Sequence, residues 1–163
     1  MEEYTIEALK WMVNLLNKHN IPYQISGGFA AKIYGSTRPL NDIDFDIPED
    51  KFELLLPEIS QNIIYGPAQY VDGKWDAYLM TINYKGQEID ICGSSKTKIT
   101  SRDRKVWIPL KVNFSKNIKL LLFNTEVNLV HPSDLIEYKQ HLDGDHQLED
   151  IENSKQYIIS SNI

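Results

Sequence analysis

Apolar residues recur at helical spacing in the first stretch of the chain. Between residues 3 and 18 the apolar positions include Ile6, Leu9, Met12, Val13, Leu15 and Leu16. This spacing predicts a helix with one buried face. The polar run at 17–20 and the proline at position 22 then end the helix. A β-prone segment at 23–26 and an apolar stretch at 29–34 predict a short strand and a second helix.

Residues 42–47 alternate strictly between acidic and apolar side chains, because they read Asp-Ile-Asp-Phe-Asp-Ile. A period of two predicts a strand whose two faces differ. One face carries Asp42, Asp44 and Asp46, whereas the side chains between them are all apolar. The strand therefore borders the core on one side and a polar region on the other.

The rest of the chain predicts further helices and strands in an irregular order. They are a helix from 48 to about 60 that Pro57 interrupts, strands near 67–71, 75–84 and 87–92, a loop over 93–105, extended chain over 106–130, and helices over 132–142 and 145–159. This order predicts an α+β fold, in which a mixed β-sheet is flanked by helices and followed by a C-terminal helical tail. We expect one compact domain, with a core at 1–130 and helices at 131–163 packed on it.

Composition narrows the class of protein. Of 163 residues, 42% are hydrophobic and 25% are charged, as in ordinary globular domains. The 17 basic and 23 acidic residues give a net charge of −6, so we expect no non-specific binding to duplex DNA, which requires a basic surface. The single cysteine, Cys92, excludes an internal disulfide and a cysteine-based zinc cluster. We find no signal-like or membrane-spanning run, and therefore expect a cytoplasmic protein with no membrane partner.

The three carboxylates at positions 42, 44 and 46 are the strongest chemical feature of the chain. Like charges side by side raise one another's pKa and cost free energy. A divalent cation with oxygen ligands would relieve this cost. The alternative is a solvated edge strand, whose acids face water and discourage aggregation.

Two further motifs point to the same chemistry. Ser26-Gly27-Gly28 closes one expected strand and opens a helix, where glycines let the backbone approach a phosphate. A tight turn is the alternative for such a pair of glycines. Glu88-Ile89-Asp90-Ile91 repeats the alternation of acidic and apolar residues. Asp90 would join Asp42 and Asp44 if the two strands are neighbours, and a solvated strand face is the alternative.

Together these motifs resemble those of the nucleotidyltransferase superfamily, which has the DNA polymerase β-like fold. The family motif is a pair of small residues, a loop and then Asp-hydrophobic-Asp, which Gly27-Gly28 and Asp42-Ile43-Asp44 match. The segment 37–44 looks most like small antibiotic nucleotidyltransferases of the lincosamide type and nucleotidyltransferase toxins of the abortive-infection type. The match extends over 21–47, is weaker at 87–92 and is loose at 131–152.

The resemblance implies a catalytic metal site. Asp42, Asp44 and Asp90 would hold Mg²⁺ or Mn²⁺ and carry the catalysis, with Asp90 also able to act as a base. Asp46 lies outside the family motif, and we expect it to support a metal ligand or to face solvent.

The resemblance also implies nucleotide-binding residues. Ser26, Gly27 and Gly28 would cradle the β- and γ-phosphates of an NTP. Arg38 would steady a phosphate or shape its loop, and a surface ion pair is the alternative. Lys139 would contact the triphosphate from a C-terminal helix, and a solvated lysine is the alternative.

These expectations lead to one main hypothesis. The protein would be a metal-dependent nucleotidyltransferase that moves an NMP group from an NTP to an acceptor hydroxyl and releases pyrophosphate. The acceptor would be a small molecule or an RNA end, and the basic loop at 96–105 is the candidate contact for an acceptor phosphate. An alternative is a catalytically weak or inactive binding module of the same fold, such as a nucleotide sensor or an antitoxin-like partner, because His146-Gln147 stand where the family has Lys-Asp. A structural protein with an acidic strand is a further alternative.

Overall fold

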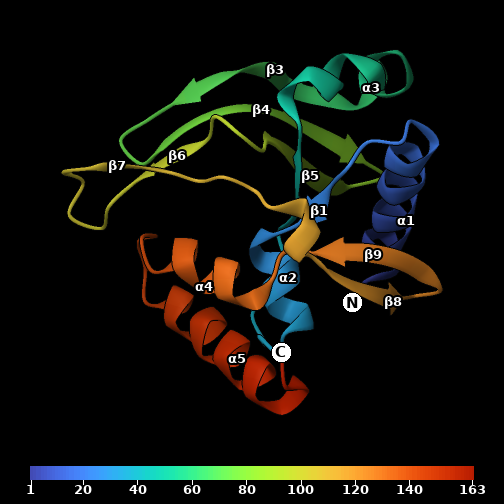
Figure 1. The fold of residues 1–163 in the computed structure, drawn as a ribbon. Coiled ribbons are helices and arrows are strands. Elements are labelled where there is room, and N and C mark those ends of the chain that lie inside the picture. Colours follow the sequence, from blue (N-terminus) through green and yellow to red (C-terminus); the bar gives the residue numbers. More distant parts are fainter.

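The computed structural model describes residues 1–163, which form one nine-stranded sheet flanked by five α-helices (Figure 1). The α-helices are α1 (Glu3–Lys18), α2 (Gly27–Ile33), α3 (Phe52–Ile59), α4 (Pro132–Lys139) and α5 (His146–Ser161). The strands are β1 (Gln24–Ile25), β2 (Asp42–Ile47), β3 (Ile63–Val71), β4 (Trp75–Tyr84), β5 (Gln87–Gly93), β6 (Lys98–Thr100), β7 (Trp107–Pro109), β8 (Ile118–Leu122) and β9 (Thr125–Leu129). Three short 3₁₀ helices are η1 (Glu49–Lys51), η2 (Ser60–Asn62) and η3 (Phe114–Lys116).

The sheet is mixed, which confirms the expected α+β class. Its strand order is β7-β6-β4-β5-β2-β1-β9-β8, and β3 lies along the other side of β4. Strands β2 and β5 run parallel, as do β1 and β9, whereas the remaining pairs are antiparallel. The pairing of β2 with β5 sets two acidic strands side by side.

The two faces of the sheet have opposite character. In the β2–β5 register Asp44 lies opposite Asp90, and Ile43 lies opposite Ile89. Paired residues point to the same face of a sheet, so the acids gather on one face and the apolar residues on the other. The apolar face is the core, and its fully buried members on β2, β4 and β5 are Ile43, Phe45, Ile47, Met80, Ile82, Ile89 and Ile91.

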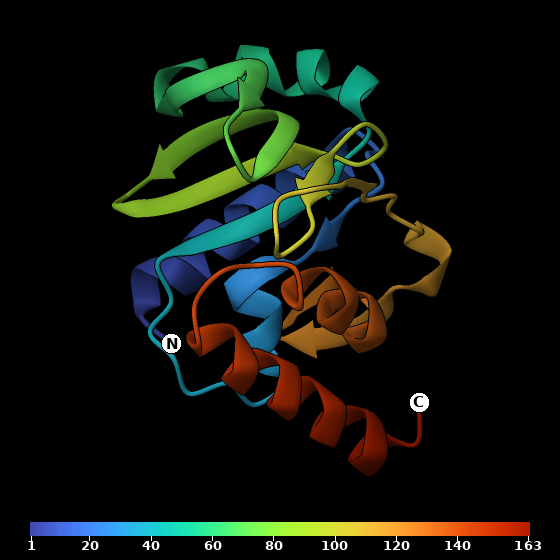
Figure 2. The ribbon, with the colours of Figure 1, turned by 90° about the vertical axis from the view of Figure 1, so that its left-hand side faces the viewer.

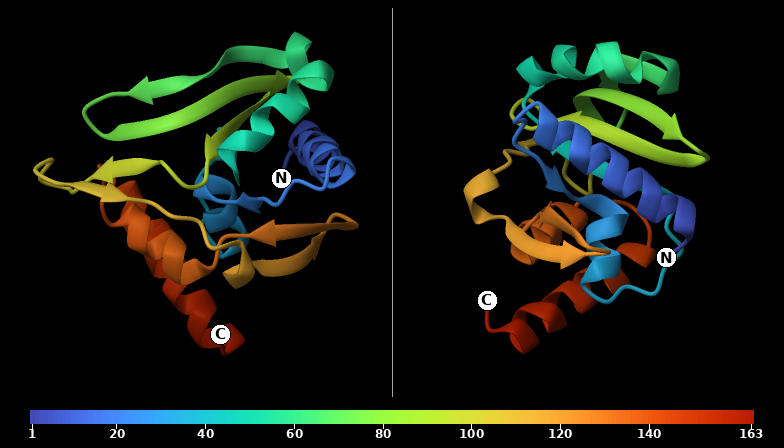
Figure 3. Two further views of the ribbon diagram at one scale, coloured as in Figure 1. Left: turned by 45° about the horizontal axis from the view of Figure 1, so that its top comes forward. Right: turned by 90° about the vertical axis from the view of Figure 1, so that its right-hand side faces the viewer.

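Helices α1 and α3 cover this apolar face. The Trp11 ring of α1 stacks on Tyr84 of β4 with centroids 4.2 Å apart, and Phe52 of α3 meets Tyr78 edge-on at 5.1 Å. The right-hand view of Figure 3 shows α1 crossing obliquely in front of the strands. This packing buries Leu9, Met12, Val13, Leu15 and Leu16, as the helical spacing of 3–18 predicted, whereas Ile6 is only half-buried.

Helices α4 and α5 pack together away from α1 and α3, and α5 also contacts α2. The Tyr157 ring of α5 meets that of Tyr34 at the end of α2, with centroids 4.5 Å apart. In Figure 2 the two C-terminal helices, in orange and red, lie below the strands that carry the acids. None of the helices combines the length and the apolar character that a membrane crossing needs.

Three local expectations were wrong. Strand β6 lies inside the segment 93–105 that we expected to be a loop; its only apolar residue is the buried Ile99, so no periodicity announces it. Pro57 does not interrupt α3, which continues for two residues beyond it to Ile59, although proline cannot donate a hydrogen bond there. Helix α4 ends at Lys139, short of the expected 142.

Phe45→Ala is expected to lower the free energy of unfolding by about 3–5 kcal/mol, because it leaves a cavity at a fully buried position under the acidic face. Leu121→Ala is the matched control, since Leu121 is 73% exposed and should change stability by less than about 0.5 kcal/mol. Urea unfolding measures both. Equal losses in the two variants would contradict the assignment of Phe45 to the core.

Candidate active site

A cleft of about 590 Å³ opens over the acidic face of the sheet. Its floor includes Asp42, Asp44 and Asp46 of β2. The start of α2, the segment 109–113 that follows β7, and helix α4 form its walls. The cleft therefore brings together segments from most of the chain, and a small organic ligand of ordinary size would fit it.

Carboxylates from two strands converge at one end of this face. Asp42, Glu88 and Asp90 each offer an oxygen, and these oxygens lie within 4.8 Å of one another. Thr81 donates a hydrogen bond of 2.5 Å to Asp90 from the next strand. Asp90 thus lies beside Asp42, as we expected, because β2 and β5 are neighbours.

Glu88 is a residue that sequence reasoning did not select. It lies opposite Asp42 in the β2–β5 register. The signal was present, because Glu88 and Asp90 alternate with apolar residues in the same way as Asp42 and Asp44. Only the strand register could show that both acids of β5 lie on the same face of the sheet as the acids of β2.

Asp44 lies against the glycine turn instead of in that group of three. A Cβ atom on Gly27 would come within 1.5 Å of the Asp44 Oδ2 atom, and Gly27 has a φ of +58°, which glycine tolerates far better than other residues. The amide of Ser26 donates to the Asp44 carbonyl at 2.9 Å. The turn and the acidic strand are therefore closely packed, and both the backbone conformation and the contact with Asp44 require a glycine at position 27.

The acidic face carries a strong electrostatic penalty. Burial raises the pKa of Asp44 to about 8, and the charges of Asp42, Asp90 and Asp46 add to the effect. Burial and then the charge of Asp90 also raise the pKa of Asp42, which Lys139 partly offsets. Hard oxygen donors with excess negative charge fit Mg²⁺ or Mn²⁺. Asp42, Asp44, Glu88 and Asp90 are the residues that could hold such an ion.

Asp46 also lies on the cleft floor, two residues after Asp44 on β2. Burial raises its pKa to about 6, and Gln24 donates a hydrogen bond of 2.9 Å to its carboxylate. Its register partner is Cys92, whose thiol pKa is raised well above the ordinary value, first by burial. Asp46 thus belongs to the cleft, and Cys92 is not a reactive thiol.

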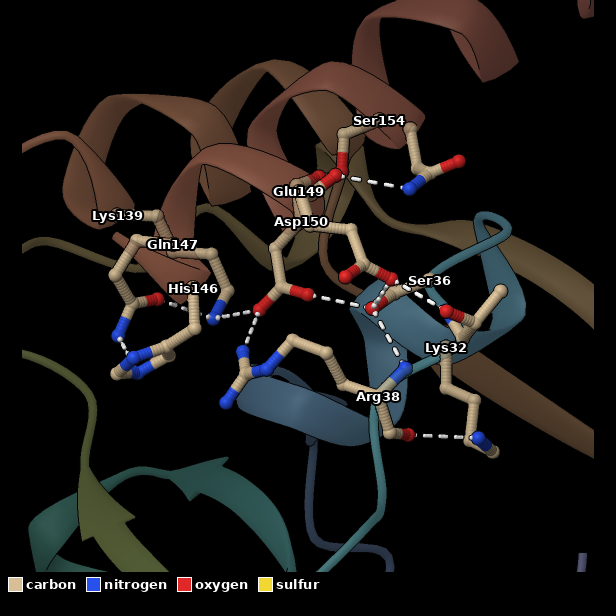
Figure 4. A network of polar contacts seen from close by, with 11 residues as sticks. Lys32, Ser36, Arg38, Lys139, His146, Gln147, Glu149, Asp150 and Ser154 are labelled. Atoms are coloured by element: carbon tan, nitrogen blue, oxygen red, sulfur yellow. Dashed lines mark hydrogen bonds and ion pairs between the residues drawn. The ribbon is translucent and has the colours of Figure 1, made fainter. Parts of the chain in front are cut away.

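Arg38 and Lys139 meet at one buried carboxylate (Figure 4). The Lys139 Nζ atom lies 2.8 Å from Asp150, and the Arg38 Nη1 atom lies 2.5 Å from the same side chain. Lys139 is only 4% exposed, so the reading of this residue as a solvated lysine was wrong. Arg38 does form an ion pair, but its partner is fully buried.

Several cleft residues carry no signal in the sequence. Trp75, the segment 109–113 and Tyr138 all line the cleft, yet they come from β4, the chain after β7, and α4. The pKa of the Tyr138 phenol is raised well above its ordinary value, first by burial and then by Asp44 and Asp46. Such residues meet through long-range packing that no local spacing encodes.

No family model and no curated protein matches this chain. Solved structures do match it over nearly the whole length. A candidate nucleotidyltransferase from Thermotoga maritima gives a TM-score of 0.68 at 12% identity, over 97% of this chain and 92% of the other. The lincosamide antibiotic adenylyltransferase LnuA, solved with lincomycin bound, gives 0.61 at 12% identity, over 93% and 96%. ANT(2″)-Ia in complex with adenylyl-2″-tobramycin gives 0.63 at 10% identity, over 97% and 91%.

These likenesses show that the chain has a nucleotidyltransferase-like fold, as its motifs predicted. At such low identity they concern the fold, and the roles of individual residues rest on the geometry of the cleft.

Asp44→Asn is expected to stabilise the protein when a chelator is present. Because the pKa of Asp44 is raised from 3.8 to about 8, the folded protein keeps a proton that the unfolded chain releases. Wild-type stability therefore falls as the pH rises from the lower value towards the higher one, and a neutral amide escapes this loss. The gain near neutral pH should exceed about 1.4 kcal/mol, the equivalent of one pKa unit.

Urea unfolding at acidic and at neutral pH measures this gain. Below the ordinary pKa of 3.8 the carboxyl is protonated in both states, so the advantage of the variant should disappear. A gain that is independent of pH would show that the packing of asparagine, and not charge, is responsible.

Gly27→Ala is expected to destabilise the protein by at least about 2 kcal/mol, because a side chain there is strained and would displace Asp44. It should also weaken Mn²⁺ binding, measured by calorimetry. Gly28→Ala is the matched control, since its Cβ would meet only Leu40 at the ordinary distance of 3.7 Å. Equal stability and Mn²⁺ affinity in the two variants would contradict the packing of Asp44 on the turn.

Proposed function

We propose that this protein is a metal-dependent nucleotidyltransferase, which moves an NMP group from an NTP to an acceptor hydroxyl. The observation that carries the proposal is the convergence of carboxylates from β2 and β5 beside a glycine turn. A fold shared with nucleotidyltransferases supports it.

The transfer needs little covalent chemistry from the protein. The acceptor oxygen forms a bond to the α-phosphorus, and the bond from that phosphorus to the α–β bridging oxygen breaks. Pyrophosphate leaves with the electron pair of that bond. The proton of the hydroxyl passes to Asp90, whose other neighbour is the Thr81 hydroxyl at 2.5 Å.

Asp42, Asp44 and Asp90, with Glu88 beside them, would hold the divalent cation. When bound, Mg²⁺ or Mn²⁺ supplies positive charge at the phosphoryl oxygens and at the attacking oxygen. Asp42, Glu88 and Asp90 would fix its position from two neighbouring strands, with Asp44 alongside, and so the apolar face of the sheet would indirectly orient the reaction.

Ser26, Gly27 and Gly28 would bind the β- and γ-phosphates through their backbone, and Arg38 and Lys139 would balance the phosphate charge. Gly28 and Lys139 both line the cleft. Their placement next to Asp42 and Asp44 fits a triphosphate whose α-phosphorus lies above the acids.

The acceptor is best described as a small hydroxyl compound. The cleft of about 590 Å³ has the size of an ordinary small-molecule site. LnuA was solved with lincomycin, and ANT(2″)-Ia with adenylyl-2″-tobramycin. An RNA end is the other candidate, through the basic residues of 96–105.

A binding module without turnover is the second candidate function. Gln147 stands where the family has a charged aspartate, and it accepts a hydrogen bond from Lys139 at 3.1 Å. The absence of that charge favours binding without catalysis. Such a module would bind an NTP in the same cleft and release it unchanged.

Label transfer from α-³²P NTPs tests the proposal, with Mg²⁺ or Mn²⁺ and acceptors that include a lincosamide, an aminoglycoside and a short RNA. The double variant Asp42→Asn with Asp44→Asn should lose more than about 100-fold in rate, because both replaced groups would hold the cation. Asp50→Asn is the control, since its side chain is 74% exposed. Transfer that persists in the double variant would sink the assignment, and NTP binding without any transfer would favour the module.

A further inference from the structure

Asp150 of α5 is a fully buried carboxylate that receives hydrogen bonds from two other parts of the chain. The Ser36 hydroxyl donates to it at 2.7 Å and the Arg38 guanidinium at 2.5 Å, both from the loop after α2. Lys139, the last residue of α4, lies 2.8 Å away. Figure 4 shows these side chains converging on Asp150. Two positive charges therefore share one negative partner.

A small polar cavity of about 180 Å³ lies beside this cluster. Its lining includes Arg38, Lys139 and Asp150, together with Gly28 and Asp42. Gly28, Asp42 and Lys139 also line the large cleft. Lys139 thus lines both cavities, as does Asp42, an aspartate that would hold the cation.

The cluster holds its charges because they are paired. Burial alone would raise the pKa of Asp150, but hydrogen bonds from Lys139 and Ser36 bring it below its ordinary value. Buried ions are tolerated only with such partners. Without the carboxylate the two cations would repel each other, and each would turn towards water.

The loop that carries Arg38 is tied down separately. Glu149, the neighbour of Asp150 on α5, accepts hydrogen bonds of 2.8 Å from the amide and the hydroxyl of Thr37. Lys32 donates to the carbonyl of Arg38 at 2.8 Å. Glu149 and Lys32 therefore hold the loop without touching the Arg38 guanidinium or the Lys139 ammonium, whereas Asp150 contacts both of these groups as well as the Ser36 hydroxyl.

We propose that Asp150 is a positioning residue, which holds Lys139 and Arg38 at the polyphosphate end of a bound nucleotide. The inference rests on the proposed function, since it assumes that an NTP occupies the cleft. It goes beyond that function because it makes α5, remote in sequence from the acidic strands, responsible for the preference for a triphosphate over a monophosphate.

Calorimetry with three separate ligands, which are ATP, AMP and Mn²⁺, tests the proposal. Asp150→Asn should weaken ATP binding by about tenfold or more, because charge-assisted contacts to the terminal phosphates are lost. Its affinities for AMP and for Mn²⁺ should stay within about twofold of wild type, since neither ligand reaches the polyphosphate end.

Glu149→Gln is the matched control. It changes the neighbouring carboxylate, which clamps the same loop but touches neither cation. ATP affinity should stay close to wild type in this variant. An equal loss of ATP affinity in both variants would show that Asp150 acts only by holding the loop, and it would overturn the proposal.

Asp150→Glu keeps the test informative if the asparagine variant does not fold. It retains the charge and so keeps the cations paired, but it moves the carboxylate by one methylene. We expect a several-fold loss of ATP affinity with unchanged Mn²⁺ affinity. A ratio of ATP to AMP affinity equal to that of wild type would overturn the proposal.

The outcomes separate this inference from the proposed function. If wild type binds neither Mn²⁺ nor ATP, the proposed function fails and the inference fails with it. If wild type binds both and transfers label, but Asp150→Asn and Asp150→Glu discriminate ATP from AMP as wild type does, only the inference fails.

Discussion

The structure depends on holding like-charged carboxylates together against their repulsion. Burial raises the pKa of Asp42 and of Asp44, and the negative charge of Asp90 raises both further. They stay together because the opposite side of the same strands is a buried apolar surface. A shift of the register by one residue would bury the acids and expose Phe45 and its neighbours, and the core therefore enforces the arrangement of the site.

The glycine turn is the second half of this constraint. Asp44 fills the space that a side chain on Gly27 would need, so strand β2 and the start of α2 approach more closely than other residues would allow. The close approach puts backbone that could meet a phosphate next to acids that could hold a cation. Burial beside this turn raises the pKa of Asp44, so the charge that the proposed chemistry would need there lowers stability.

How much could be predicted from sequence follows from the range of each interaction. The alternation in 42–47 is local, and it predicted both faces of β2 correctly. Asp90 needed a resemblance to known motifs, because spacing does not encode that β5 pairs with β2. Glu88 was missed for the same reason, although its signal matched that of Asp90. The burial of Lys139 was beyond sequence reasoning, because it depends on how α5 packs on α4, and an isolated lysine on a helix is normally solvated.

The distribution of charge explains how an acidic protein could bind an anion. With a net charge of −6, the chain as a whole repels a triphosphate, so attraction must come from groups placed at short range. The acids of β2 line the cleft, whereas Lys139 at the end of α4 lines both cavities and Arg38, from the loop after α2, lines the smaller one. Both cations are paired with the buried carboxylate of Asp150, and the charge of Lys139 also lowers the pKa of Asp42 and of Asp44. If the proposed function holds, the acids of β2 would hold the metal ion, and the two cations paired with Asp150 would meet the phosphates.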